Sequence, residues 1–159
     1  MSKVPRPVGH KRRRTSYKDT EPPVPLTFVR IVHGKITKKH KRPEPLRALI
    51  DSSASASIIC KKQLHGNKSY RSNETKWQTT AGTVSTNGKS KIDFFLSEFS
   101  DSRKITHDFH VVNTVLPSYD MIIGRDLMHL LKLDVQFSTG SLDWFEHGSI
   151  PLKPSDATL

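Results

Sequence analysis

The sequence predicts a small all-β fold, either a barrel or a sandwich. The chain has 159 residues, which is room for one domain and a tail. Short apolar or β-branched runs recur along it between polar turns, as strands of such folds do. Only residues 125–131 have the apolar spacing of a short helix. About nine short strands with a single helix are typical of a small barrel or sandwich.

The expected elements follow from the apolar runs and the turn residues between them. Strands are expected at residues 26–32, 46–50, 57–60, 83–86, 89–99, 106–112, 119–124, 135–137 and 141–144. The dipeptide Asn87-Gly88 predicts a hairpin turn, because a type I′ turn needs positive φ at both central residues. Thr139-Gly140 predicts a second hairpin. Residues 38–42 and 65–73 are polar, and we expect an exposed turn and a loop there.

The charge divides the chain into a basic N-terminal segment and a nearly neutral remainder. Residues 1–45 hold 13 Lys or Arg and 3 Asp or Glu, whereas residues 46–159 hold 13 and 12. We therefore expect a basic, proline-rich disordered tail at 1–25, one domain at 26–146 and a flexible tail at 147–159. The run Lys11–Arg14 could contact RNA or DNA phosphates or serve as a nuclear import signal, and a solvated linker is the alternative.

The cysteine count, the spacing of two histidines and the length of the apolar runs exclude several classes of site. Cys60 is the only cysteine, so one chain can form neither a disulfide nor a cysteine-based zinc site, which fits a reducing compartment. His107 and His110 lie three apart in an expected strand, on opposite faces, and are not expected to chelate one metal ion. No apolar run is long enough for a membrane span, and no secretory signal is expected.

The first segment that carries chemistry is the apolar run 46–50, which ends at Asp51. A carboxylate at the end of a buried strand is partly desolvated, which raises its pKa and suits it to proton transfer. The alternative is that Asp51 only forms a turn or caps one.

A second segment, 119–127, favours a functional role for Asp51. It joins an apolar strand to Gly124-Arg125-Asp126-Leu127, about 70 residues after Asp51. Together with Asp51-Ser52-Ser53-Ala54, this motif resembles the retropepsin-like aspartic proteases of gypsy-type LTR retrotransposon polyproteins, in order and in spacing. Residues 77–84 look like the flap region of that family, with 80–84 as the flap itself and Asn87-Gly88 as the alternative tip. Residues 133–144 look like its closing strands. The resemblance covers residues 26–146.

The resemblance implies a closed barrel with a flap hairpin and one short C-terminal helix, active as a homodimer. It implies an aspartic endopeptidase without metal or cofactor, whose two copies of Asp51 share a proton and activate a water to cleave a polypeptide. Polyprotein processing would place the protein in the cytoplasm, in virus-like particles or in the nucleus.

The resemblance also assigns roles to individual positions. Ser52, Ser53 and Ala54 match the active-site loop, in which the hydroxyl of Ser52 braces the dimer. The substrate-binding positions implied are Ser55, Ala81, Gly82, Thr83, Ile122 and Ile123. Gly124, Arg125 and Asp126 are structural, and Arg125 would brace the loop through a carboxylate. Some viral members have Asp at the position of Ser55. In this chain Asp126 or Asp120 would be the substitute carboxylate partner of Arg125.

Ser53 departs from the family, which has glycine at this position. Glycine allows left-handed backbone geometry and a close approach of substrate. If the position required left-handed geometry, serine would cost about 1–2 kcal/mol. Two hypotheses therefore remain open: an active protease, or a catalytically impaired retropepsin-fold module that binds nucleic acid or protein.

Overall fold

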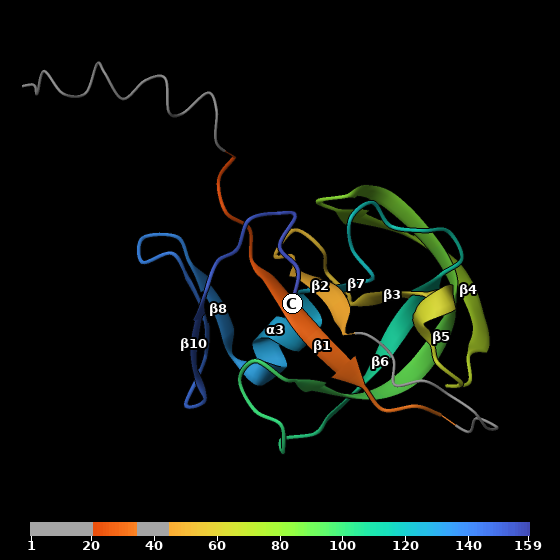
Figure 1. Ribbon diagram of the computed structural model, residues 1–159. Helices are drawn as coiled ribbons and strands as arrows, with labels where there is room; N and C mark the ends of the chain where they lie inside the picture. The colour runs from red at the N-terminus through yellow and green to blue at the C-terminus, as the bar shows by residue number, and fades with distance from the viewer. Residues whose placement is uncertain (1–20, 35–44) are drawn as a thin grey trace, which may run out of the picture.

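The computed structural model describes residues 21–34 and 45–159, which form ten strands, one α-helix and one 3-10 helix (Figure 1). The elements are β1 (Leu26–Ile31), β2 (Leu46–Ile50), β3 (Ile58–Cys60), η1 (Lys61–Gln63), β4 (Tyr70–Thr79), β5 (Gly82–Leu96), β6 (Ile105–Val112), β7 (Met121–Ile123), α3 (Arg125–Leu131), β8 (Leu133–Gln136), β9 (Ser141–Trp144) and β10 (Gly148–Pro151). The basic run 11–14 and the expected turn at 38–42 lie outside the described residues.

Seven strands form one sheet that closes on itself. The strand order is β1-β2-β7-β3-β6-β5-β4, and β1 also pairs with β5. This extra pairing, in which Val29 lies opposite Leu96, joins the two ends of a six-stranded ring. Because β4 pairs only with β5, the β4–β5 hairpin extends from the ring as a separate ribbon. The expected all-β barrel with one short helix is confirmed.

The barrel encloses one large apolar core. Phe94 of β5 and Phe109 of β6 are fully buried there and meet edge to face, with ring centroids 5.6 Å apart. Leu127 of α3 enters the same core, which fixes the helix against the barrel. A smaller cluster, which includes Val84 of β5 and Ile122 of β7, lies beneath the β4–β5 hairpin. This smaller cluster includes Ala54, three residues after Asp51.

Three strands after the helix form a second, antiparallel sheet in the order β10-β9-β8, beside α3 and β1 in Figure 1. Trp144 of β9 packs edge to face on Phe99, which ties this sheet to the main core. Residues 147–159 were expected to be a flexible tail, and this is wrong, because they contain β10. Arg47 also donates hydrogen bonds to the carbonyl oxygens of Ser155 and Ala157.

The turn of the β4–β5 hairpin lies at residues 80–81. The prediction of a turn at Asn87-Gly88 is wrong: both residues lie inside the 15-residue strand β5, where Gly88 pairs with Arg71 and Val111. The expectation of a loop over 65–73 fails in part, since β4 begins at Tyr70. The other expected strands and the helix are present, with ends shifted by a few residues.

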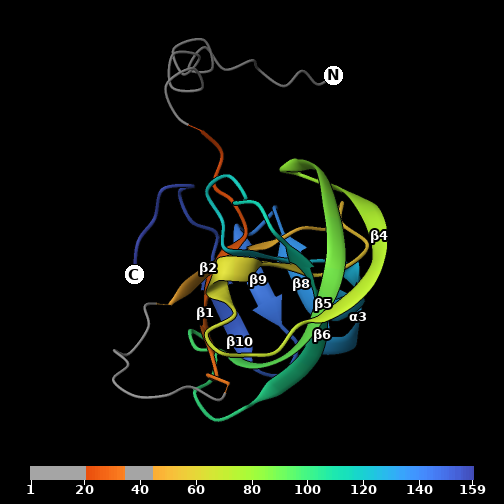
Figure 2. The ribbon, with the colours of Figure 1, turned by 90° about the vertical axis from the view of Figure 1, so that its right-hand side faces the viewer.

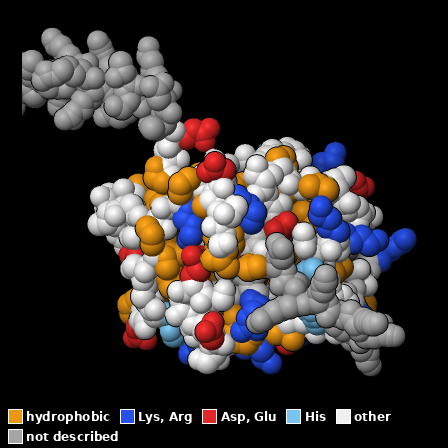
Figure 3. All heavy atoms as spheres, viewed as in Figure 1, with side chains coloured by type: hydrophobic (Ala, Val, Ile, Leu, Met, Phe, Trp, Pro, Cys, Tyr) orange, Lys and Arg blue, Asp and Glu red, His pale blue; other side chains and the backbone are white. Residues whose placement is uncertain are grey.

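The surface of the described residues carries both signs of charge. Figure 3 shows basic, acidic and apolar side chains interspersed on one face, in keeping with the near balance of charge over 46–159. No described helix has the length and apolar character needed to cross a membrane.

Candidate active site

Asp51 lies where two parallel strands end side by side. In the β2–β7 pair, Ile50 lies opposite Ile123, and the amide of Asp51 donates to the carbonyl of Ile123 at 2.9 Å. The two sequence motifs, one after each strand, are therefore neighbours in space. The Asp51 residue is only 3% exposed.

The loop after Asp51 folds back onto its carboxylate. The amide of Ser53 donates to Asp51 Oδ1 at 2.9 Å, and the hydroxyl of Ser53 donates to the same oxygen at 2.5 Å. The amide of Ala54 closes the turn on the Asp51 carbonyl at 3.1 Å. Ser53 is not among the residues with positive φ, so this loop does not require glycine for its backbone conformation.

The tip of the β4–β5 hairpin contacts the same carboxylate. Thr80 donates its amide to Asp51 Oδ2 and its hydroxyl to Asp51 Oδ1, both at 2.8 Å. Figure 2 shows the hairpin curving past one end of the barrel. The flap expected from the sequence at 80–84 thus begins at the hairpin tip, and it covers Asp51 of its own chain.

These contacts set the ionisation of Asp51. Burial raises the pKa of the carboxyl, but the hydrogen bonds from Ser53 and Thr80 together outweigh it, so the pKa lies below its ordinary value of 3.8. The expectation of a raised pKa is therefore wrong for the single chain. The donors that reverse the shift come from the loop and the flap, not from β2.

Gly124 and Arg125 hold the active-site loop from the other side. A Cβ atom on Gly124 would lie 2.4 Å from the carbonyl oxygen of Ala56 and 2.8 Å from that of Ala54, so only glycine fits. The Arg125 amide donates to the Ala54 carbonyl at 2.8 Å, and its guanidinium donates to the Ser52 carbonyl at 2.7 Å. Arg125 thus braces the loop through a backbone carbonyl. The carboxylate partner expected from the sequence, Asp120 or Asp126, does not take this role.

Asp126 organises a second set of hydrogen bonds behind the loop. Its carboxylate accepts from the hydroxyl of Ser57 at 2.8 Å, and His107 Nε2 lies 2.8 Å away. The Ser57 hydroxyl in turn accepts from the amide of Gly124 at 2.9 Å. Burial raises the pKa of Asp126, but these bonds, chiefly from His107 and Ser57, leave it below 3.8. Asp126 therefore links β6, the helix and the loop.

The other predicted site residues divide into two groups. Ile122 faces the small cluster under the flap, with Val84, whereas Ile123 is buried in the main core. Of the two, only Ile122 belongs to the cluster beneath the flap. The exposed or half-buried positions are Ser52, Ser53, Ser55, Ala81, Gly82 and Thr83. The flap positions among them lie at the hairpin tip, and Gly82 has φ +102°.

The two histidines of β6 have separate partners. His107 lies against Asp126, while His110 stacks on Trp77 with ring centroids 4.5 Å apart. Within residues 21–34 and 45–159, no group of three or more His, Cys, Asp or Glu side chains could hold a metal ion. Cys60 is buried, and burial raises the pKa of its thiol, as expected for a core residue.

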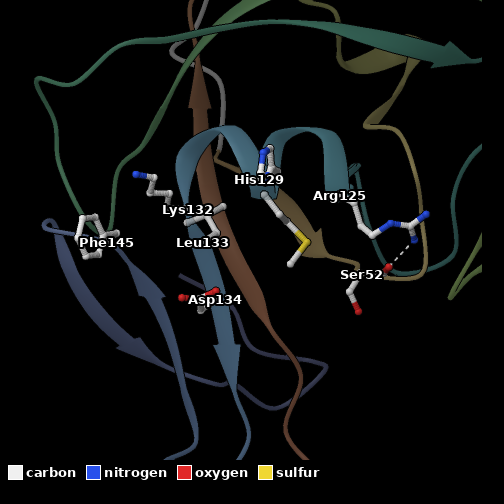
Figure 4. Close-up of a pocket in the computed structure, with 8 residues that line it drawn as sticks. Ser52, Arg125, His129, Lys132, Leu133, Asp134 and Phe145 are labelled. Carbon is white, nitrogen blue, oxygen red and sulfur yellow. Dashed lines mark hydrogen bonds between the residues drawn. The ribbon is translucent and has the colours of Figure 1, made fainter.

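A groove of about 480 Å³ opens beside the active-site loop (Figure 4). Ser52 and Arg125 lie at one end of it, joined by their hydrogen bond, and Phe145 lies at the other. Met128 of α3 and Leu133 of β8 supply apolar lining between them. Phe145 is 57% exposed.

The roles of three residues of the site were not predicted from the sequence. Thr80 begins the expected flap, but nothing in the sequence shows that it reaches Asp51, 29 residues earlier. Ser57 and His107 have no local signal either, because their common partner Asp126 lies 69 and 19 residues further along the chain. Only the chain's three-dimensional path brings these groups together.

One protein family matches most of the chain. Residues 25–136 match the family described as "Retroviral aspartyl protease". Two solved structures are similar. The EIAV protease in complex with the inhibitor HBY-793 has 22% identity and a TM-score of 0.41, over 69% of this chain and 88% of that one. The retroviral protease-like domain of Ddi1 from Leishmania major has 14% identity and a TM-score of 0.49, over 85% and 99%. No curated protein matches the chain.

Proposed function

Because the chain belongs to the retroviral aspartyl protease family, we propose that it is an aspartic endopeptidase and that Asp51 is one half of its catalytic dyad. The observation that carries the proposal is the position of Asp51: a buried carboxylate at the ends of two parallel strands, beneath a hairpin tip. Such a carboxylate is held in a fixed position and is largely shielded from water.

The mechanism needs two carboxylates, and each chain supplies one such aspartate, so the active form is a homodimer. Two Asp51 side chains about 3 Å apart cannot both ionise, and the pair holds one proton. The ionised group removes a proton from a bound water, while the protonated group donates to the oxygen of the scissile carbonyl. The pKa values of such a pair belong to the dimer and not to either chain.

The groove beside Ser52 is the surface on which we place the second copy. A two-fold axis next to Asp51 brings this groove to the interface, because Ser52 follows Asp51 directly. Several exposed apolar side chains lie on α3 or directly after β8 and β9, and a partner would cover them. They are Leu130, Phe137 and Phe145.

The substrate is a polypeptide, held between the barrel and the flap. Ile122 and Val84 form apolar surface beneath the hairpin, which favours apolar residues beside the cleaved bond. Ala81, Gly82 and Thr83 at the tip would contact the peptide backbone, and Ser55 would contact it from the loop.

The biological setting proposed is polyprotein processing in a gypsy-type retrotransposon, in the cytoplasm or within virus-like particles. Its support is the resemblance of the two sequence motifs to proteases of that type. The basic residues before the domain would then contact the element's RNA or DNA through phosphate.

The test is cleavage of a peptide library by the purified chain between pH 4 and 6, with a metal chelator present. We expect Asp51→Asn to reduce the rate about a thousandfold or more, since an amide cannot act as the base. Asp101→Ala, a change in an exposed turn, serves as the control and should keep the wild-type rate. Activity that survives in Asp51→Asn, or that the chelator removes, would contradict the proposal.

A second candidate function rests on the hydroxyl of Ser53, which lies 2.5 Å from Asp51 Oδ1. A donor at this oxygen competes with the water or with the partner carboxyl. The domain would then be a catalytically impaired binding module with a basic tail. Cleavage by a Ser53→Gly variant but not by the wild type would identify this case, because the variant restores the family's residue.

A further inference from the structure

The carboxylate of Asp51 accepts hydrogen bonds on both of its oxygens from its own chain. An ionised carboxylate offers about four lone-pair sites. Four donors from the same chain bond to the Asp51 carboxylate. Oδ1 accepts from the amide and hydroxyl of Ser53 and from the hydroxyl of Thr80, and Oδ2 accepts from the amide of Thr80. A lytic water, or the proton of a second carboxyl, needs these same oxygens. In the single chain Oδ1 is therefore saturated, and Oδ2 is covered by the amide of Thr80.

The hairpin tip is built to present Thr80 in this way. The hydroxyl of Thr79 donates to the carbonyl of Gly82 at 2.7 Å and accepts from the amide of Ala81 at 3.0 Å, which fixes the turn around Thr80. Lower in the hairpin, Trp77 donates to Thr86 and packs on His110. The tip is thus held in a defined shape before it meets Asp51.

We propose that Thr80 caps Asp51 in the single chain and that this capped form is a latent state of the enzyme. The proposal rests on the proposed function, since it concerns access to the same carboxylate. The cap has two contacts, one on each carboxylate oxygen, so its departure leaves Oδ2 without a donor and Oδ1 with only the two donors of Ser53. Peptide and partner reach Asp51 only after Thr80 has left.

The cap has a kinetic consequence. A peptide that binds only the open form has an apparent affinity reduced by the fraction of chains that are open. Thr80→Val removes one of the two cap contacts and keeps the shape of the side chain. It should therefore lower KM by up to about tenfold without lowering kcat. Loss of an ordinary substrate contact would raise KM instead.

The decisive test measures the cap without relying on activity. Amide hydrogen exchange at residue 80 is followed by NMR at pH 6, in full-length chain dilute enough to be monomeric. We expect protection in the wild type, exchange about tenfold faster in Thr80→Val, and a larger loss of protection in Asp51→Ala. Thr75→Val is the matched control on the same hairpin, because the Thr75 hydroxyl bonds only to the Asn73 carbonyl, and it should leave residue 80 protected.

The outcomes separate the cap from the protease. Protection of residue 80 that is lost in Thr80→Val supports the cap even if no variant cleaves peptide, in which case only the proposed function fails. Exchange at residue 80 that is equally fast in the wild type and in Asp51→Ala overturns the cap, whatever the activity. If Asp51→Ala fails to fold, equal exchange in the wild type and Thr80→Val overturns it too.

Discussion

Gly124→Ala is expected to destabilise the domain by about 3 kcal/mol, the upper end of the usual cost of overpacking. The added Cβ would lie 2.4 Å from the Ala56 carbonyl oxygen and 2.8 Å from the Ala54 carbonyl oxygen. Both are backbone atoms of the active-site loop, so they cannot turn away as a side chain would. The loop must shift, and Asp51 with it.

Thermal unfolding measures this loss directly, and about 3 kcal/mol corresponds to a fall in Tm of roughly 12 °C for a domain of this size. Gly88→Ala is the matched control. Its Cβ would lie 3.3 Å from the nearest atom, the Tyr70 carbonyl oxygen, and should cost less than about 1 kcal/mol. Equal losses in the two variants would show that close approach at Gly124 is not what requires glycine.

Asp126→Ala is expected to cost a similar amount, about 3 kcal/mol, because it leaves the buried hydroxyl of Ser57 and the ring of His107 without their partner. Asp126→Asn keeps one acceptor oxygen and should cost only about 1 kcal/mol. Denaturant unfolding at neutral pH distinguishes the two. Asp101→Ala, in an exposed turn, should change stability by less than about 0.5 kcal/mol.

The pH dependence gives the same prediction a second readout. Since the pKa of Asp126 is lowered by folding, its stabilising contribution is fully present above its ordinary value of 3.8 and is lost as pH falls through the folded-state pKa. The difference in stability between wild type and Asp126→Asn should therefore shrink in acid. A difference that stays constant down to pH 2 would mean that Asp126 is not held ionised by these contacts.

The sequence was a good guide where local pattern decides the structure. The run 46–50 and the helix at 125–131 follow from hydrophobic periodicity, and both are present as predicted. Their meeting at Asp51 required the resemblance to a family, because nothing local pairs β2 with β7. The closed barrel likewise depends on β1 pairing with β5, about 65 residues away.

The errors came from positions where distant contacts override local preference. Asn87-Gly88 has the composition of a turn, yet β5 continues through it, because Gly88 is paired to β4 on one side and β6 on the other. The pKa of Asp51 was expected to rise with burial, but the hydrogen bonds from Ser53 and Thr80 together lower it. Ser53 raised a concern about backbone strain, whereas its backbone is ordinary and its hydroxyl is what matters.

The central claim is that two copies of Asp51, one from each chain, form a single catalytic site. Mixing active and Asp51→Asn chains tests it, with Ser53→Gly in both so that the Ser53 hydroxyl is absent. At constant total concentration and after exchange of subunits, an equimolar mixture should keep about a quarter of the activity, since only about a quarter of the dimers carry two aspartates. Retention of about half would mean that each chain acts alone, and would contradict the shared dyad.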